Sequence, residues 1–190
     1  MFNDVRFGGY LIWRRAGTHP VFIDGRNEVY PDLLRDVFRA LQDPAGWTAL
    51  LDRHAIDSAF LRYPPALQKV LYPGRDGKAP VAGERAFSAA YFPRETWALV
   101  YWDDDAMIYL RRTPEHQAVI ARLEYRAIHP DDWRYLFAGV LTSRLDAGPI
   151  LAEIGRKIAE DPACRRARML FARFSGLAGG IREAAPAGGG

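Results

Sequence analysis

FNDVRFGGYLIWRRAGTHPVFIDGR, residues 2–26, is the segment from which the fold of this chain can be predicted. Its first residues have the character of a strand end, and the pair Gly8-Gly9 allows a close backbone turn before a short amphipathic helix. The apolar run at residues 20–23 predicts a second strand that is covered on both faces. Because a helix joins the two strands within so few residues, we predict a parallel pair with a right-handed crossover.

Polar residues follow both predicted strands. Asn3 and Asp4 come after the first strand, and Asp24 and Arg26 come after the second. Since ligands bind outside the carboxyl ends of parallel strands in an open α/β sheet, we predict a ligand-binding edge at these residues, together with Tyr30. The alternative is that Asp24 and Arg26 pair with each other or cap helices, and so only fix the loops.

The remainder of residues 1–112 is predicted to complete a three-layer α/β domain. Its mixed sheet is expected to hold three parallel strands followed by an antiparallel hairpin. We predict helices at residues 31–41, 47–53 and 67–71, a third strand at 56–61, an exposed loop at 73–84, an edge strand at 86–92 and a hairpin of 97–102 with 107–110.

From residue 113 onward the apolar residues recur only at helical spacing. We predict a helical appendage over residues 113–178, with its main helices at about 131–143, 147–160 and 164–177. The last two helices resemble a single tetratricopeptide-like unit. The Gly- and Ala-rich residues 179–190 are predicted to be a disordered tail.

The composition excludes several classes of protein. With 49% apolar and 13% aromatic residues, the chain can bury enough surface to offset the entropy lost on folding. The net charge is only +3 and the basic residues are interspersed with acidic ones, which disfavours nucleic acid as a partner. No apolar run reaches the length of about 18 residues that predicts a membrane span.

Reactive residues are sparse. Cys164 is the single cysteine, so neither an internal disulfide nor a thiolate metal site is possible. The four histidines are scattered without the spacing of zinc ligands, and no serine lies in a nucleophile elbow. We therefore predict no metal, no cofactor and no catalytic residue set in this chain.

Four motifs taken together resemble a known family. They are FND-x3-GGYLIWR at residues 2–14, PVFIDGR at 20–26, GW-x2-LLDRH-x-ID at 46–57 and W-x-LVYWDDDAMIYLRR at 97–112. The set resembles the soluble C-terminal domain of bacterial glycosyltransferase-like multi-spanning membrane proteins, in the protein mannosyltransferase and aminoarabinose transferase class. The resemblance covers residues 1–112, and the helical remainder is similar to the short tails that follow such domains.

The resemblance implies a location at the periplasmic face of the inner membrane and a polyprenyl-phosphate sugar as donor. In that family the catalytic carboxylates lie in the membrane half, which would be the partner of this domain, so no catalytic residue is transferred to this chain. We expect a non-catalytic accessory or recognition domain in the assembly of envelope glycans or glycolipids. Two alternatives stay open: a stand-alone α/β enzyme that binds a nucleotide or sugar phosphate, and a protein-interaction module that acts through the helical tail.

Overall fold

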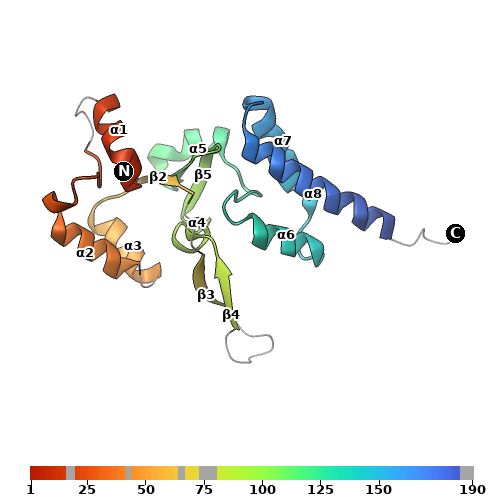
Figure 1. Ribbon diagram of the computed structural model, residues 1–190, viewed down its shortest axis with the longest axis horizontal. Helices are drawn as coiled ribbons and strands as arrows, with labels where there is room; N and C mark the ends of the chain where they lie inside the picture. Colours follow the sequence, from red (N-terminus) through yellow and green to blue (C-terminus); the bar gives the residue numbers. More distant parts are fainter. Residues whose placement is uncertain (16–19, 42–43, 64–66, 73–80, 185–190) are drawn as a thin grey trace. The chain divides into compact units, whose positions relative to one another are not determined.

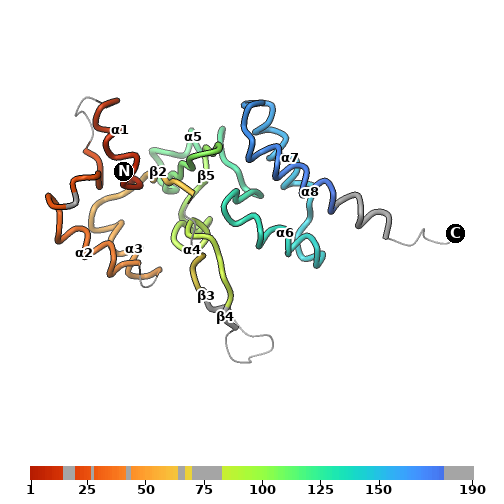
Figure 2. Tube along the Cα trace, viewed as in Figure 1, coloured from red at the N-terminus to blue at the C-terminus, as the bar shows by residue number. Residues whose placement is uncertain are grey.

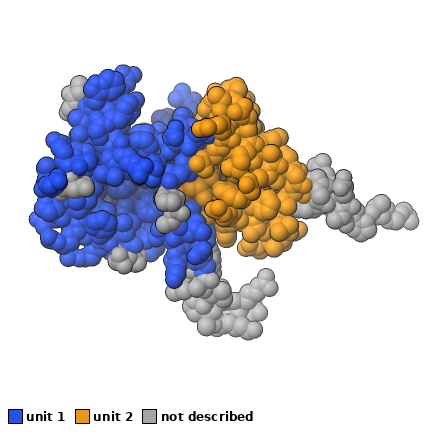
Figure 3. Space-filling view, viewed as in Figure 1, with its two compact units in different colours: residues 1–124 blue, residues 125–190 orange. Residues whose placement is uncertain are grey.

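The computed structural model describes residues 1–15, 20–41, 44–63, 67–72 and 81–184. The chain divides into two compact units, residues 1–124 and 125–190, which Figure 3 colours separately. Residues 113–124, which the sequence assigns to the helical appendage, belong to unit 1. Among the described residues, no helix is long and apolar enough to cross a membrane.

Unit 1 contains a four-stranded mixed sheet in the order β1-β2-β6-β5 (Figure 1). The strands are β1 Phe2–Asn3, β2 Ser58–Arg62, β5 Trp97–Trp102 and β6 Ala106–Arg111. Strand β1 runs parallel to β2, whereas β2 with β6 and β6 with β5 are antiparallel. The prediction of a mixed α/β fold that ends in an antiparallel hairpin is therefore confirmed.

The prediction of a second parallel strand at residues 20–23 is wrong. This segment joins no strand ladder, and the partner of β1 is β2 instead. The buried side chain of Asn3 bonds to the segment in place of a strand: its Oδ1 accepts from the N–H of Phe22 (2.8 Å), and its Nδ2 donates to the carbonyl of Ile23 (2.7 Å). A side-chain amide carries the same donor and acceptor as a peptide group, so it can satisfy an extended segment without a neighbouring strand.

Five helical elements of unit 1 overlap segments predicted to be helical, although Gly8 and Gly9, predicted to form a turn before the first helix, lie within it. They are α1 Val5–Arg15, α2 Pro31–Ala40, α3 Pro44–Arg53, the short η3 Pro114–His116 and α5 Gln117–Leu123. A further short turn, η1 Asn27–Val29, precedes α2. Figure 2 traces how these segments follow one another along the chain.

The structure differs from the predicted elements between residues 67 and 84. The predicted helix at residues 67–71 is strand β3, Gln68–Tyr72, which pairs with β4, Val81–Arg85, in a separate two-stranded sheet. The pattern there spans too few residues to separate a helix from a strand. Of the predicted loop at 73–84, residues 73–80 lie outside the described residues, and 81–84 belong to β4.

The predicted edge strand at residues 86–92 is helix α4, Phe87–Tyr91. Phe87 and Tyr91 are one helical turn apart, and both rings contact the indole of Trp47 at 5.5 Å between centroids. Phe2 and Phe92 also pack on Trp47, which is almost completely buried. Aromatic packing of this kind supplies large burial energy, so it overrides the local strand preference.

Unit 2 consists of three helices at the predicted positions. They are α6 Trp133–Leu141, α7 Ala147–Glu160 and α8 Arg165–Ala184. Helix α7 packs on α8 with Ile150, Ile154, Leu170 and Phe174 buried. Helix α8 continues past the predicted start of the tail at residue 179, and residues 185–190 lie outside the described residues. The tetratricopeptide-like character stays a prediction.

Glu153 of α7 anchors the segment that leads into α6. Its carboxylate accepts hydrogen bonds from the backbone N–H groups of Arg126 (2.6 Å), Ala127 (2.8 Å) and Ile128 (2.9 Å). One carboxylate thereby accepts hydrogen bonds from three successive backbone N–H groups.

Helix α1 lies very close to the segment after residue 22. A Cβ atom added at Gly8 would lie 2.3 Å from the carbonyl oxygen of Ile23 and 2.6 Å from the Cα of Asp24. A Cβ added at Gly9 would meet nothing within 4 Å. The two adjacent glycines therefore have different roles, and only Gly8 is required by packing.

We expect Gly8→Ala to lower the free energy of unfolding by about 1–3 kcal/mol, because the added methyl group forces two backbones apart. Gly9→Ala is the matched control, and it should raise the free energy of unfolding by about 0.5–1 kcal/mol, since alanine favours the helix. Urea denaturation followed by tryptophan fluorescence measures both. Equal shifts in the same direction would contradict the close packing at Gly8.

Candidate functional site

The predicted polar residues lie at one rim of the sheet. Asn3 and Asp4 stand at the carboxyl end of β1, where the N–H of Asp4 donates to the carbonyl of Phe60 in β2 (3.0 Å). The Nδ2 of Asn3 donates to the carbonyls of both Asp4 (3.0 Å) and Ile23 (2.7 Å). Asp24 follows Ile23 directly, so Asn3 brings the two predicted polar pairs together.

Asp24, Arg26 and Tyr30 form a hydrogen-bonded group at this rim. The guanidinium of Arg26 donates to Asp24 through Nε (3.0 Å to Oδ1) and Nη2 (2.6 Å to Oδ2), and Nη2 also reaches the Tyr30 hydroxyl at 3.5 Å. The Asp24 side chain is 3% exposed, whereas that of Arg26 is 65% exposed. The Asp24 carboxylate is thus buried beneath the Arg26 guanidinium, which faces solvent. This is the pairing expected if Asp24 and Arg26 only fix the loops.

Hydrogen bonds within this group stabilise the ionised forms of Asp24 and Arg26. Those from the Arg26 guanidinium hold the pKa of the Asp24 carboxyl well below its usual range, with the Tyr30 hydroxyl and the backbone N–H of Arg26 acting in the same direction. The hydrogen bond to Asp24 likewise raises the pKa of Arg26 and, as the largest cause, that of Tyr30. At neutral pH the pair is fully ionised, because each partner stabilises the charged form of the other.

Asp4 begins helix α1. Its Oδ1 accepts the backbone N–H of Arg6 at 2.9 Å, which is the geometry of a helix N-cap. Asp4 therefore stands at the carboxyl end of the parallel strand β1, whereas Asp24 and Arg26 pair with each other and follow a segment that joins no strand.

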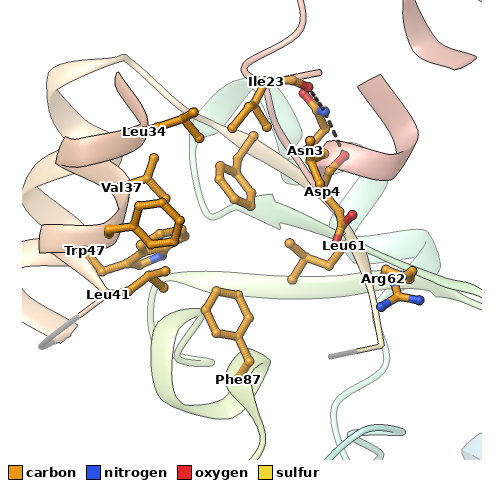
Figure 4. Close-up of a pocket in the computed structure, with 13 residues that line it drawn as sticks. Asn3, Asp4, Ile23, Leu34, Val37, Leu41, Trp47, Leu61, Arg62 and Phe87 are labelled. Carbon is orange, nitrogen blue, oxygen red and sulfur yellow. Dashed lines mark hydrogen bonds between the residues drawn. The ribbon is translucent and has the colours of Figure 1, made fainter. Parts of the chain in front are cut away.

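An apolar pocket of about 380 Å³ opens beside this rim, at the carboxyl ends of β1 and β2 (Figure 4). Asn3 and Asp4 line it, whereas Asp24, Arg26 and Tyr30 do not. Helix α2 forms one wall with residues spaced along a single face. The lining residues are Phe2, Asn3, Asp4, Val5, Ile23, Leu34, Val37, Phe38, Leu41, Trp47, Leu61, Arg62 and Phe87.

Arg62 is the functional candidate that the sequence reasoning missed. It is the last residue of β2, as Asn3 is the last residue of β1, and the two strands run parallel. The Nε of Arg62 is buried, and no described residue accepts a hydrogen bond from it. Leaving such a donor unsatisfied costs about 1–3 kcal/mol or more, so an acceptor supplied by a ligand would be stabilising.

The residues that line the pocket could hold a ligand that is apolar at one end and polar at the other. Within the described parts of the chain, no group of three His, Cys, Asp or Glu side chains could hold a metal ion. The pocket offers apolar walls, a guanidinium with an unused donor and the Asp4 carboxylate. These features fit an apolar chain with an anionic head that also carries a hydroxyl group.

Comparison of the chain with family models, with curated proteins and with solved structures gave no match.

The Asp24–Arg26 pair predicts a dependence of stability on pH. Because the folded-state pKa of Asp24 is lowered, its contribution is present above the unfolded pKa of about 4 and is lost as the pH falls below that value. We expect Asp24→Asn to be less stable than the wild type near neutral pH, and the difference should shrink between about pH 4 and pH 2.

Urea-unfolding midpoints measured across this range test the dependence. Asp105→Asn, at an exposed position of the β5–β6 turn, is the control for loss of one carboxylate. A gap between Asp24→Asn and the wild type that stays constant on acidification would contradict the lowered pKa.

Proposed function

We propose that unit 1 is a non-catalytic recognition domain that binds an amphiphile with an anionic head group. The observation that carries this proposal is Arg62, whose buried Nε lacks a partner among the described residues, beside an apolar pocket. The pocket volume of about 380 Å³ lies within the range of small-molecule sites in proteins.

The two charged residues of the pocket would contact different groups of the ligand. Arg62 makes no ion pair with a described residue, so its guanidinium can donate to a phosphate or carboxylate. Asp4 lines the same pocket, and its Oδ1 is held by the N–H of Arg6. A carboxylate at this place disfavours a second anion but can accept a hydrogen bond from a hydroxyl group, which supports a ligand that carries a sugar next to its phosphate.

The family resemblance gives this ligand class a biological setting. A polyprenyl-phosphate sugar, or a glycolipid acceptor, combines an apolar chain with a phosphate and hydroxyl groups. We propose that the domain acts in envelope glycan or glycolipid assembly at the periplasmic face of the inner membrane. There it would present such a ligand to the transmembrane half of a glycosyltransferase-like protein, and Asp24 and Arg26 would fix the rim rather than react.

Binding of farnesyl phosphate tests the proposal, with farnesol and inorganic phosphate as probes that lack the head or the chain. We expect Arg62→Gln to weaken binding of farnesyl phosphate roughly ten- to hundredfold, the loss of one charged hydrogen bond, and to leave farnesol unchanged. Isothermal titration calorimetry measures the affinities.

Two further variants sharpen the test. Arg122→Gln removes an exposed arginine of α5 that does not line the pocket, and it should bind like the wild type. Phe38 lines the pocket yet is largely exposed, so Phe38→Ser should weaken binding of both isoprenoids without unfolding the domain. Farnesyl phosphate binding that survives Arg62→Gln unchanged would refute the role of the guanidinium.

A further inference from the structure

Helix α1 exposes aromatic side chains on the face that points away from the core. Trp13 is 74% exposed and Tyr10 is 53% exposed. The opposite face is packed: Leu11 is buried, and Phe7 stacks on Phe60 with 4.2 Å between ring centroids. Unit 1 therefore leaves its most exposed tryptophan on a helix whose other side is fixed in place.

The exposed residues of α1 form one continuous surface. At helical spacing Val5, Gly9 and Trp13 follow each other along one row, and Arg6 and Tyr10 form the adjacent row. The rings of Tyr10 and Trp13 are 6.2 Å apart. Since a Cβ at Gly9 would meet nothing within 4 Å, the middle of this face is open.

The charges of α1 differ from those of the neighbouring surface helix. Helix α1 has the sequence VRFGGYLIWRR, which contains no acidic residue. The exposed Arg6 and Arg14 make no ion pair with any described residue. On α2, by contrast, Arg35 pairs with Asp32 at 2.8 Å and Arg39 with Asp36 at 3.4 Å.

We infer that α1 docks unit 1 on an anionic lipid surface. Trp and Tyr prefer the boundary between head groups and acyl chains, because their rings are apolar and their N–H and O–H groups need polar partners. Arginines on the same face attract lipid phosphates. The α1 face combines Trp and Tyr with arginines that make no ion pair with a described residue, and the helix has no acidic residue, which suits an anionic interface.

The docking surface on α1 is separate from the apolar pocket, although the two adjoin at Val5. Val5 is partly exposed in the first row of the α1 face and also lines the apolar pocket. A helix that lies on lipid would therefore bring the pocket next to the source of an isoprenoid chain. The docking itself does not require the pocket to be occupied.

Co-sedimentation with vesicles tests the inference. We expect the chain to bind vesicles made of equal parts of phosphatidylcholine and phosphatidylglycerol, and to bind pure phosphatidylcholine vesicles much more weakly. Binding should shift the tryptophan emission to shorter wavelength, because Trp13 is exposed while Trp47, Trp97 and Trp102 are buried. Trp13→Ala should lose this shift and most of the binding.

The charge requirement has a matched control. The double variant Arg6→Gln/Arg14→Gln should weaken binding to the mixed vesicles roughly ten- to thirtyfold. Arg35→Gln/Arg39→Gln removes the same charge from α2, where both arginines are paired, and it should weaken binding far less. Equal losses in the two double variants would show that only net charge matters and would overturn the assignment to α1.

Two other results would also overturn the inference. The wild type could fail to bind the mixed vesicles and sediment as a dimer that Trp13→Ala dissociates. In that case the α1 face is a contact between copies of the chain. If Arg62→Gln abolishes vesicle binding while Trp13→Ala retains it, lipid is held by the pocket and not by α1. Farnesyl phosphate binding is measured without vesicles, so failure of the pocket and failure of the docking surface are distinguishable.

Discussion

The side-chain amide of Asn3 links strand β1 to a segment that has no strand partner of its own. Its oxygen accepts from Phe22, and its nitrogen donates to the carbonyls of Ile23 and Asp4. Each peptide group left without its partner would cost about 1–3 kcal/mol in this buried setting. The contact holds Ile23, the residue before Asp24, beside the end of β1.

The rim of the pocket is fixed from two sides as a result. Asn3 holds the segment from the sheet, and Gly8 allows α1 to approach it so closely that no side chain fits between them. Asp24 is committed to Arg26 within this rim, whereas Arg62 retains an unused donor. A rigid polar rim lowers the ordering cost of binding, and the apolar wall of α2 supplies area for contact.

The sequence allowed the longer helices and the hairpin to be predicted because their periodicity extends over many residues, whereas the short elements β3 and α4 were predicted as the wrong type. It did not allow the partner of β1 to be chosen, since a polar side chain that replaces a strand leaves no periodic signal. The strand-end rule located Asn3 and Asp4 correctly at the sheet rim. Applied to the end of β2 it would also have found Arg62, but the pocket itself depends on where α2 and α4 pack, which local patterns do not encode.

The carboxylate of Glu153 couples a loop of unit 2 to helix α7. It binds the amides of residues 126–128, which share no regular secondary structure, and it does so from the middle of α7. In the folded chain the amides of this loop are held by hydrogen bonds to α7. Hydrogen exchange at these amides should consequently report the opening of α7, which makes an irregular loop part of the same cooperative unit as a helix.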